Sequence, residues 1–175
     1  DMKLIVPKAT AKKLISMGVI DDVTLTYTKN SAVFKSDEYT IYTRLIEGKY
    51  FAYQKMFTEG EINTCASRTA LIGAMTRAKM CTEEKQPAVF QIEDDVLNIS
   101  IRDKLADYQE QVPLQETVCK SIRLGFDSRL VLETLKAFTC DNIALGFTSP
   151  RTPMIVEAED SDMKAMVLPV AIREA

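Results

Sequence analysis

The side chains with the greatest capacity for chemistry in this chain are two groups of carboxylates. Asp94 and Asp95 are adjacent, and Glu157, Asp160 and Asp162 follow one another closely. Carboxylate oxygens are the ligands that Mg²⁺ and Ca²⁺ prefer, so either group could hold a catalytic metal. Both groups fall where the sequence predicts turns, and solvated acidic loops are the commoner reason for such groups. A metal-dependent enzyme is therefore only the third of three functional hypotheses.

Other kinds of catalysis are restricted by composition. The 175 residues include no histidine, which excludes Ser-His-Asp and Cys-His triads. General acid–base chemistry near neutral pH would then need a strongly shifted Glu, Asp, Lys or Cys. The phosphate-binding patterns GxGxxG and GxxxxGK[ST] and the nucleophile pattern GxSxG are also missing. We expect no enzyme, no catalytic residue, no metal and no cofactor.

The thiols give no sign of a metal or redox site. Four cysteines occur, and they are widely spaced and never form CxxC. This spacing argues against zinc binding and against a redox pair. We therefore expect reduced thiols in or near a core, at Cys65, Cys81, Cys119 and Cys140.

Length and hydropathy favour a folded protein outside the membrane. With 46% hydrophobic residues, the chain is long enough for one large or two small cores. No apolar run reaches the roughly 20 residues of a membrane helix. The opening residues DMKLIVPKA lack the apolar stretch of a signal peptide. We expect a cytoplasmic protein with no membrane partner.

A strand–helix–strand–strand–strand order is repeated along the chain. Pro7 suits a first helical turn and Gly18 suits a helix end. Ser67 can cap a second helix, and a third begins at Asp127 with apolar residues on one face. The predicted helix starts, at 7, 67 and 127, are 60 residues apart. The predicted strands are 3–6, 23–27, 32–35, 39–46, 89–93, 97–102, 108–114, 121–126, 142–147, 154–157 and 166–170.

This repeat predicts an α+β fold in which each unit buries one face of its sheet against its own helix and a neighbouring one. Two such units would form one two-layer domain, with helices on one face and antiparallel sheets on the other. Three such units are therefore an odd number for a chain made of complete domains.

Charge is distributed unevenly between helices and strands. The formal net charge is −3, but the three predicted helices carry +6 and the remainder −9. A basic helical face attracts a phosphate backbone. Asn, Gln and Arg are too sparse there for base reading, so binding would be independent of sequence; ordinary solvated helix faces are the alternative. The candidate DNA-binding residues are Lys8, Lys12, Lys13, Arg68, Arg77, Lys79 and Lys136.

Four segments together resemble a known family. They are IVPKATAKKL (5–14), RLIEGKYFAYQ (44–54), LGFDSRLVLETLKAF (124–138) and MVLPV (166–170). In this order they are similar to the bacterial sliding clamp, the beta subunit of DNA polymerase III. The resemblance implies the DNA-clamp fold: repeated β-α-β-β-β units build three similar domains, and two subunits close head to tail into a ring with helices toward the DNA. It implies a processivity factor, which tethers polymerase to duplex DNA without a reaction of its own.

The resemblance also implies a domain organisation. Residues 1–57 match the second half of a clamp middle domain, and residues 58–175 match a complete carboxy-terminal domain. Asp1 is not an initiator residue, so we expect a fragment of a longer protein or a shortened relative. Such a chain would not close a ring by the family's interface. Because its sheet edge and apolar helix face would be open, we expect that the chain self-associates or that its first 57 residues are mobile.

In the family, a surface groove accepts short peptides from polymerases and other replication or repair proteins. Phe51 stands where the family usually has proline, which implies a different pocket shape. Packing at a domain junction is the alternative for Phe51 and Met56, and core packing is the alternative for Leu168 and Val170. The groove positions that the resemblance implies are Phe51, Lys55, Met56, Leu130, Met166, Val167, Leu168, Pro169 and Val170, with Arg151 and Pro153 on the rim.

Two hypotheses from different classes precede the metal enzyme. The first is a sliding-clamp fragment whose partners are duplex DNA, polymerase and repair proteins, and further copies of itself. The second is a stand-alone interaction module that binds partner peptides without encircling DNA.

Overall fold

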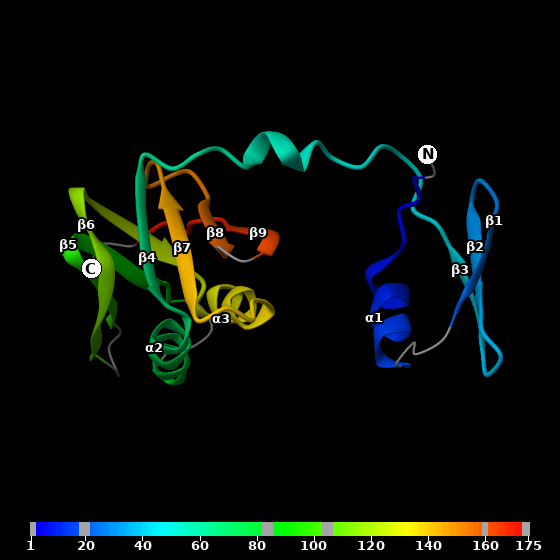
Figure 1. Cartoon of the computed structure of the whole chain (residues 1–175), viewed down its shortest axis with the longest axis horizontal. Helices are drawn as coiled ribbons and strands as arrows, with labels where there is room; N and C mark the ends of the chain where they lie inside the picture. Colours follow the sequence, from blue (N-terminus) through cyan, green and yellow to red (C-terminus); the bar gives the residue numbers. More distant parts are fainter. Residues whose placement is uncertain (1–2, 18–21, 82–85, 103–106, 159–160, 173–175) are drawn as a thin grey trace. The chain divides into compact units, whose positions relative to one another are not determined.

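The chain divides into two units, Asp1–Ala52 and Tyr53–Ala175. The structure is a computed structural model (Figure 1). It describes residues 3–17, 22–81, 86–102, 107–158 and 161–172. Among these residues, no helix is both long and apolar enough to cross a bilayer.

Unit 1 consists of one helix and a three-stranded antiparallel sheet in the order β1-β2-β3. The helix is tied to the sheet by a hydrogen bond of 2.7 Å between the hydroxyls of Thr10 and Thr43. Among the described residues of this unit, Ala32 is the one fully buried apolar side chain, whereas Ile15 is 79% exposed. Unit 1 therefore has no closed core of its own. Its elements are α1 (Lys8–Ser16), β1 (Thr24–Tyr27), β2 (Ser31–Lys35) and β3 (Thr40–Arg44).

The strand predicted at residues 3–6 is wrong. Residues 3–7 are irregular, although the Ile5 carbonyl accepts a hydrogen bond of 2.9 Å from the Ile46 amide. One such bond does not make a ladder, and Pro7 has no amide hydrogen with which to extend it.

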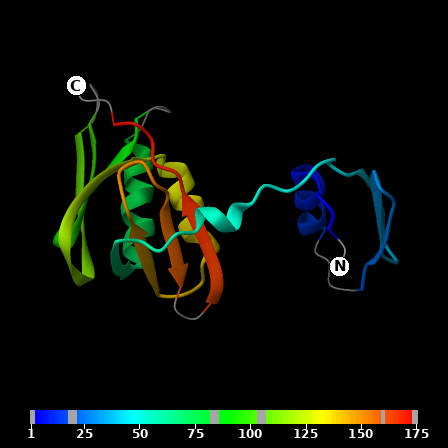
Figure 2. The ribbon, with the colours of Figure 1, turned by 90° about the horizontal axis from the view of Figure 1, so that it is seen from above.

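Unit 2 is a six-stranded sheet in the order β5-β6-β4-β7-β8-β9, with neighbouring strands antiparallel. Both helices lie on one face of the sheet and pack against each other (Figures 1 and 2). α2 contacts β4, β5 and β6, and α3 contacts β9. The elements are η1 (Tyr53–Met56), β4 (Ile62–Ser67), α2 (Arg68–Met80), β5 (Ala88–Arg102), β6 (Asp107–Phe126), α3 (Ser128–Ala137), β7 (Asn142–Phe147), β8 (Met154–Ala158) and β9 (Ser161–Val167).

The predicted interval between helices is confirmed. α1, α2 and α3 begin at Lys8, Arg68 and Ser128, 60 residues apart. The Ser67 hydroxyl accepts a bond from the Ala70 amide, and the Asp127 carboxylate accepts one of 2.8 Å from the Arg129 amide. These caps satisfy amides that have no partner within the helix. Pro7 at the start of α1 provides no side-chain cap.

Several strands differ from their predicted bounds. β4 was not predicted, because its small and polar side chains hide the alternation in which Ile62, Thr64 and Ala66 are buried. The strands predicted at 89–93 and 97–102 are one strand, β5. A bulge at Asp94, with φ 51°, interrupts its ladder with β6 without ending it. β6 likewise joins the strands predicted at 108–114 and 121–126.

The carboxy-terminal strand ends earlier in the sequence than predicted. β9 ends at Val167, whereas residues 166–170 were predicted to be the strand. Pro169 cannot donate to a ladder. The chain instead crosses to β6, where the Val170 amide donates to the Gly125 carbonyl at 2.8 Å.

The core lies between the helix pair and the sheet. Phe90 of β5 and Phe126 of β6 meet edge to face, with ring centroids 5.1 Å apart. Leu71 and Met75 of α2 and Leu135 of α3 are fully buried in the same cluster. Each such side chain stabilises the fold by about 1.5–3 kcal/mol. This burial fixes which face of each helix remains in solvent.

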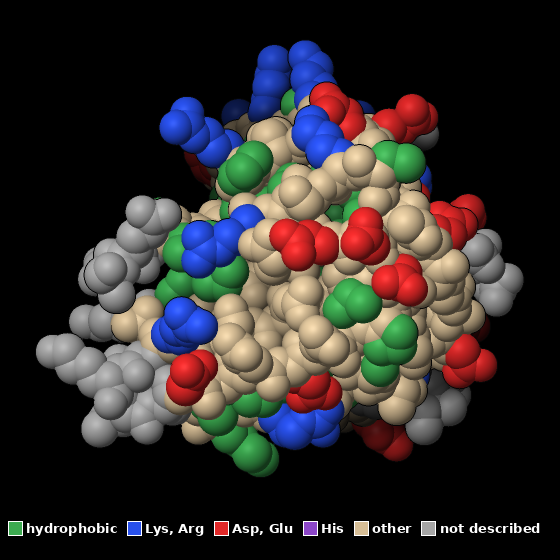
Figure 3. Space-filling model, turned by 90° about the vertical axis from the view of Figure 1, so that its left-hand side faces the viewer, with side chains coloured by type: hydrophobic (Ala, Val, Ile, Leu, Met, Phe, Trp, Pro, Cys, Tyr) green, Lys and Arg blue, Asp and Glu red, His purple; other side chains and the backbone are tan. Residues whose placement is uncertain are grey.

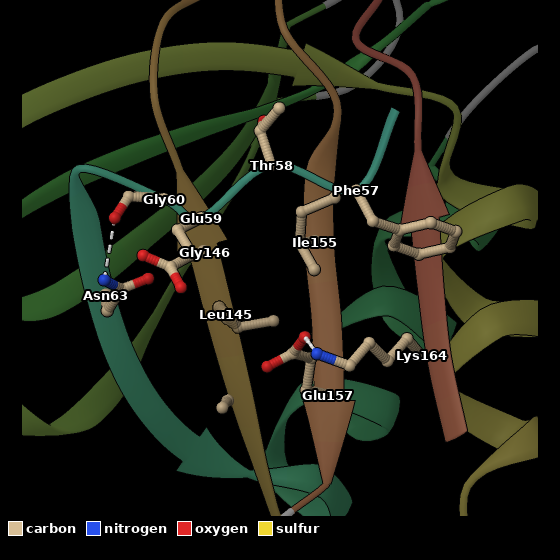
Figure 4. Close-up of a pocket in the computed structure, with 11 residues that line it drawn as sticks. Phe57, Thr58, Glu59, Gly60, Asn63, Leu145, Gly146, Ile155, Glu157 and Lys164 are labelled. Atoms are coloured by element: carbon tan, nitrogen blue, oxygen red, sulfur yellow. Dashed lines mark hydrogen bonds and ion pairs between the residues drawn. The ribbon is translucent and has the colours of Figure 1, made fainter. Parts of the chain in front are cut away.

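Two glycines allow the segment before β4 to cross β7 at close range. A Cβ on Gly60 would lie 2.8 Å from the Phe147 nitrogen and 2.9 Å from the Gly146 Cα. The Asn63 side-chain amide donates to the Gly60 carbonyl at 2.8 Å (Figure 4). The crossing therefore fixes where the chain enters unit 2.

We predict that Gly60→Ala lowers the free energy of unfolding by about 1–3 kcal/mol, because backbone atoms would have to separate to admit the methyl group. Urea denaturation measures this loss. The control is Gly73→Ala, whose Cβ would meet a side-chain atom of Arg77 at 3.2 Å rather than backbone atoms; we expect its helix-propensity gain to offset that contact. A Gly60→Ala variant as stable as the wild type would show that the crossing is not tight.

Candidate functional site

The basic residues of α1 are available to a ligand. Lys8, Lys12 and Lys13 are exposed, and none forms an ion pair with any residue in the described part of the chain. Lys8 and Lys12 are four residues apart and so share one side of the helix. These residues give α1 an exposed cationic surface.

The basic residues of unit 2 are only partly available. Lys79 of α2 and Lys136 of α3 are exposed. The Arg68 side chain instead donates through Nε to the Cys140 carbonyl at 2.6 Å, which ties the start of α2 to the segment after α3. Arg77 is held by a carboxylate on β6. Of the predicted DNA-binding residues, Arg68 and Arg77 therefore have structural partners.

Arg77 belongs to a cluster that holds α2 against β6. It donates to both oxygens of Glu110, at 2.8 Å from Nε and 2.5 Å from Nη2. The Tyr108 hydroxyl donates to the Ala74 carbonyl at 2.9 Å and also contacts Glu110. The bond from Arg77 holds the pKa of Glu110 below its ordinary value. Burial, together with the bond to Glu110, raises the pKa of Tyr108 to about 12.

Figure 3 shows the side of the molecule on which β5 and β6 lie. Among the described residues, acidic side chains predominate over the centre and right of that view, and basic side chains lie mostly toward its left.

The positions implied for a peptide groove differ in exposure. Leu130 of α3 is 51% exposed, Leu168 57% and Val170 42%. Lys55, Met56 and Arg151 are exposed as well, and Pro153, Met166 and Pro169 are half-buried. Val167 is 3% exposed and belongs to the core. Phe51 is exposed and lies in unit 1, where it stacks on Tyr50 with ring centroids 5.2 Å apart.

The tail, which we define as residues 168–172, borders a pocket of about 450 Å³. Its walls are Arg123, Leu124 and Gly125 of β6, Pro150 and Arg151 after β7, and Pro169–Ile172 of the tail. We call this the tail pocket. Of these residues, the sequence predicts a binding role for Arg151, Pro169 and Val170 alone. Gly125 was an available signal, because a glycine within a strand often marks the close approach of another chain segment.

A second pocket, of about 330 Å³, lies where residues 57–60 meet β7, β8 and β9 (Figure 4). Lys164 and Glu157 form an ion pair of 2.5 Å in its wall. Their hydrogen bond raises the pKa of Lys164. Glu157 is therefore already occupied by a cation from its own sheet.

The acidic residues are not brought together as a metal site. Asp94 and Asp95 are exposed at the bulge in β5, so the prediction that they occupy a turn is wrong. Asp162 is exposed on β9, and Asp160 lies outside the described residues. Within the described residues, no three carboxylate, thiol or imidazole side chains are grouped so as to hold a metal ion.

The four cysteines are present as thiols rather than as disulfides. Cys65, Cys81 and Cys140 are partly buried, as predicted for thiols in or near a core. Cys119 is exposed on β6, so the prediction is wrong there.

The cluster on α2 predicts a pH-dependent stability. We expect Glu110→Gln to lower the melting temperature by about 2 °C near pH 7, because the charged partner of Arg77 is lost. Since the pKa of Glu110 lies below 4.5 in the folded chain, its stabilisation is fully present above pH 4.5 and is lost as the pH falls through the folded pKa. The wild type and the variant should therefore converge in acid, once the pH is below the folded pKa of Glu110.

Thermal denaturation across this pH range measures the effect. The control is Asp107→Asn, because Asp107 lies on the same strand but 3.9 Å from Arg102 with both side chains largely exposed. We expect that control to remain near the wild type. An equal deficit of Glu110→Gln at both pH values would assign the effect to packing rather than charge.

Comparison with known proteins identifies relatives of this chain. Residues 57–171 match the family described as DNA polymerase III beta subunit, C-terminal domain. The beta sliding clamp of Staphylococcus aureus is 24% identical over 155 residues, which cover 86% of this chain and 41% of that protein. The beta sliding clamp of Streptococcus pneumoniae is 20% identical and covers 99% of this chain and 47% of its own. The chain thus spans less than half the length of these curated relatives.

Solved structures agree on the fold. The DNA polymerase III beta chain of Streptococcus pneumoniae matches 98% of this chain with a TM-score of 0.88 and 20% identity, over 48% of its own length. The beta subunit from Pseudomonas aeruginosa gives the same TM-score, identity and coverage. The predicted α+β clamp fold is therefore confirmed. Because the family match covers residues 57–171, which is more than half of the chain, the chain belongs to the DNA polymerase III beta subunit family.

Proposed function

We propose that this chain is part of a sliding clamp, a processivity factor that encircles duplex DNA and docks polymerase and repair proteins through short peptides. The observation that carries the proposal is a helix pair on one face of a six-stranded sheet in a chain of this family. Such a layer leaves the outer sides of both helices free to face a ligand. The protein would then act by holding its partners on DNA and not by catalysing a reaction.

The domain organisation follows from the same proposal. Residues 1–57 would be the second half of a middle domain, and residues 58–175 a complete carboxy-terminal domain. The open state of unit 1 supports this, because a half domain needs its other half to cover its apolar side chains. Ile15, Tyr27 and Tyr42 are more than half exposed. A ring would require the segments that this chain does not share with its longer relatives.

The proposed DNA contacts are electrostatic and independent of sequence. Lys8, Lys12 and Lys13 on α1, with Lys79 and Lys136 in unit 2, are exposed cations on helices. Arg68 and Arg77 would contribute less, because their guanidinium groups are already bonded. Phosphate contacts of this kind release counterions, so binding must weaken steeply with salt.

We predict that Lys12→Glu/Lys13→Glu weakens binding of the chain to a fluorescent DNA duplex at least roughly tenfold at low salt, because two phosphate contacts become repulsive. Fluorescence anisotropy across a salt series measures the affinity. The matched control is Lys29→Glu/Lys35→Glu, which reverses two exposed lysines of the same unit that lie off the helix. Equal losses in both variants would contradict a helical DNA face. Peptide binding without any DNA binding would favour the stand-alone interaction module.

The proposed peptide contacts are apolar. Leu130 on α3 and Leu168 and Val170 in the tail expose large apolar area, and the tail crosses β6 at Gly125. A partly extended peptide could place one or two large side chains against them, and such anchors supply most of the affinity in peptide recognition. Met56 in η1 is a further exposed apolar side chain of the same unit.

We predict that Leu168→Asp weakens binding of a synthetic peptide with Leu and Phe anchors by more than about tenfold, since a buried apolar contact is worth about 1.5–3 kcal/mol. Isothermal titration calorimetry measures the affinity. Met80→Asp is the control, because Met80 is 80% exposed on the end of α2. If Leu168→Asp bound the peptide with unchanged affinity, the tail would not be part of the peptide site.

A further inference from the structure

We propose that unit 2 binds the guanidinium group of an arginine from a partner protein, in its second pocket on the sheet. This is the pocket of about 330 Å³ whose walls come from residues 57–60, β4, β7, β8 and β9. We call it the crossing pocket, because residues 57–60 cross β7 at its edge (Figure 4). It shares no residue with the tail pocket, so the inference goes beyond the proposed capture of apolar peptides.

The floor of the crossing pocket is made of small residues. On β7, Ala144 pairs with Glu157 of β8, and Gly146 pairs with Ile155. Paired residues, and residues two apart on one strand, share a face of the sheet, so these four positions lie together. Leu145, between the two small residues, is buried in the core. Because Gly146 has no side chain and Ala144 only a methyl group, the surface of the sheet is low over β7.

Three charged groups surround this floor. The Lys164 ammonium donates to Glu157 Oε1 at 2.5 Å, and the two residues are directly opposite each other on β9 and β8. Glu59 comes instead from the crossing segment, residues 57–60 (Figure 4). It is exposed, and its carboxylate has no ion pair with any residue in the part of the chain that the structure describes. Two carboxylates against one ammonium leave the pocket with an excess of negative charge.

Lys164 shows that the crossing pocket holds a cation. The hydrogen bond to Glu157 raises the pKa of Lys164, and the charge of Glu59 contributes further to this rise. Both carboxylates therefore act on a cation in the pocket, but Glu59 is left to attract a second one from outside the chain. The same excess charge repels a phosphate backbone, so the ligand is a protein side chain and not nucleic acid.

A guanidinium group fits these features better than other cations. It is planar, so it can lie flat over Gly146, where a side chain would block it. Its forked donors can reach two acceptors at once, and Glu59 and Glu157 both belong to the walls. The methylene stem of an arginine can pack against Ile155 and Phe57. A metal ion is a poorer match, because no three ligand side chains are grouped among the described residues.

The test uses three short peptides that carry arginine, its neutral analogue citrulline, or lysine between serine and glycine residues. Each is titrated into the isotope-labelled chain, and amide correlation spectra report on the pocket through the signals of Gly60, Asn63 and Gly146. We expect the arginine peptide to bind roughly tenfold more tightly than the citrulline peptide, because charge-assisted hydrogen bonds are lost in the neutral analogue. It should also bind more tightly than the lysine peptide, which lacks the planar fork.

Two variants separate binding from a merely structural role of these charges. Glu59→Gln should abolish the advantage over citrulline, because the carboxylate that has no ion pair is lost. Lys164→Met should strengthen arginine binding several-fold, because it removes the competing ammonium and frees Glu157. The control is Glu133→Gln, which neutralises an exposed glutamate of α3 outside the pocket and should leave the affinity unchanged. The spectra also show whether each variant retains its fold.

Several results would overturn the inference. Equal binding of the arginine and citrulline peptides would do so, as would pocket signals that no peptide moves. Equal affinity for the lysine peptide would contradict recognition of a guanidinium group, and unchanged affinity in Lys164→Met would show that the ion pair does not compete with a ligand. Loss of self-association in Glu59→Gln, measured by sedimentation, would assign the pocket to a second copy of the chain and so contradict a partner protein. None of these results bears on the tail or on the helices proposed to face DNA.

Discussion

Burial of the α2–α3 pair against one face of the six-stranded sheet is the constraint on which the other features of unit 2 depend. Phe90 and Phe126 fill the space beneath the helices, and Leu135 reaches the same cluster from α3. Because each helix must turn its apolar side to the sheet, its polar side is left outward. The same packing sets the start of α3, and therefore where Leu130 is exposed beside the end of β6.

Two chain crossings then complete the unit. Gly60 and Gly146 let the incoming segment pass over β7, and Gly125 lets the tail pass over the end of β6. Both depend on the absence of a side chain, because backbone atoms stand where a Cβ would be. The first crossing fixes the entry of the chain, and the second forms part of the wall of the tail pocket. These glycines thus determine where two chain segments cross the surface of this unit, whereas the apolar side chains determine the packing of its interior.

Electrostatic partners divide the basic residues into two kinds. Arg77 is committed to Glu110 and Arg68 to a backbone carbonyl, so these cations hold α2 in place. Lys12 and Lys13 are exposed and remain candidates for phosphate. A count of charges along a helix cannot separate these kinds, because Glu110 is 33 residues away from Arg77 in the chain. Pairing across the fold decides which charges a ligand can meet.

The sequence by itself determined the local order: caps and apolar spacing placed three helix starts 60 residues apart, and the ordered motifs identified the family. It did not determine β4, the continuity of β5 and β6 through the bulge at Asp94, or the end of β9. Strand pairing joins residues far apart in the chain, so short-range alternation underspecifies it. The tail pocket likewise existed only after folding, because Gly125, Arg151 and Val170 meet through non-local contacts. Local propensity determines where the helices begin. Pairing and burial between residues far apart in the chain determine the bounds of the strands, the pockets and which charged side chains a ligand can reach.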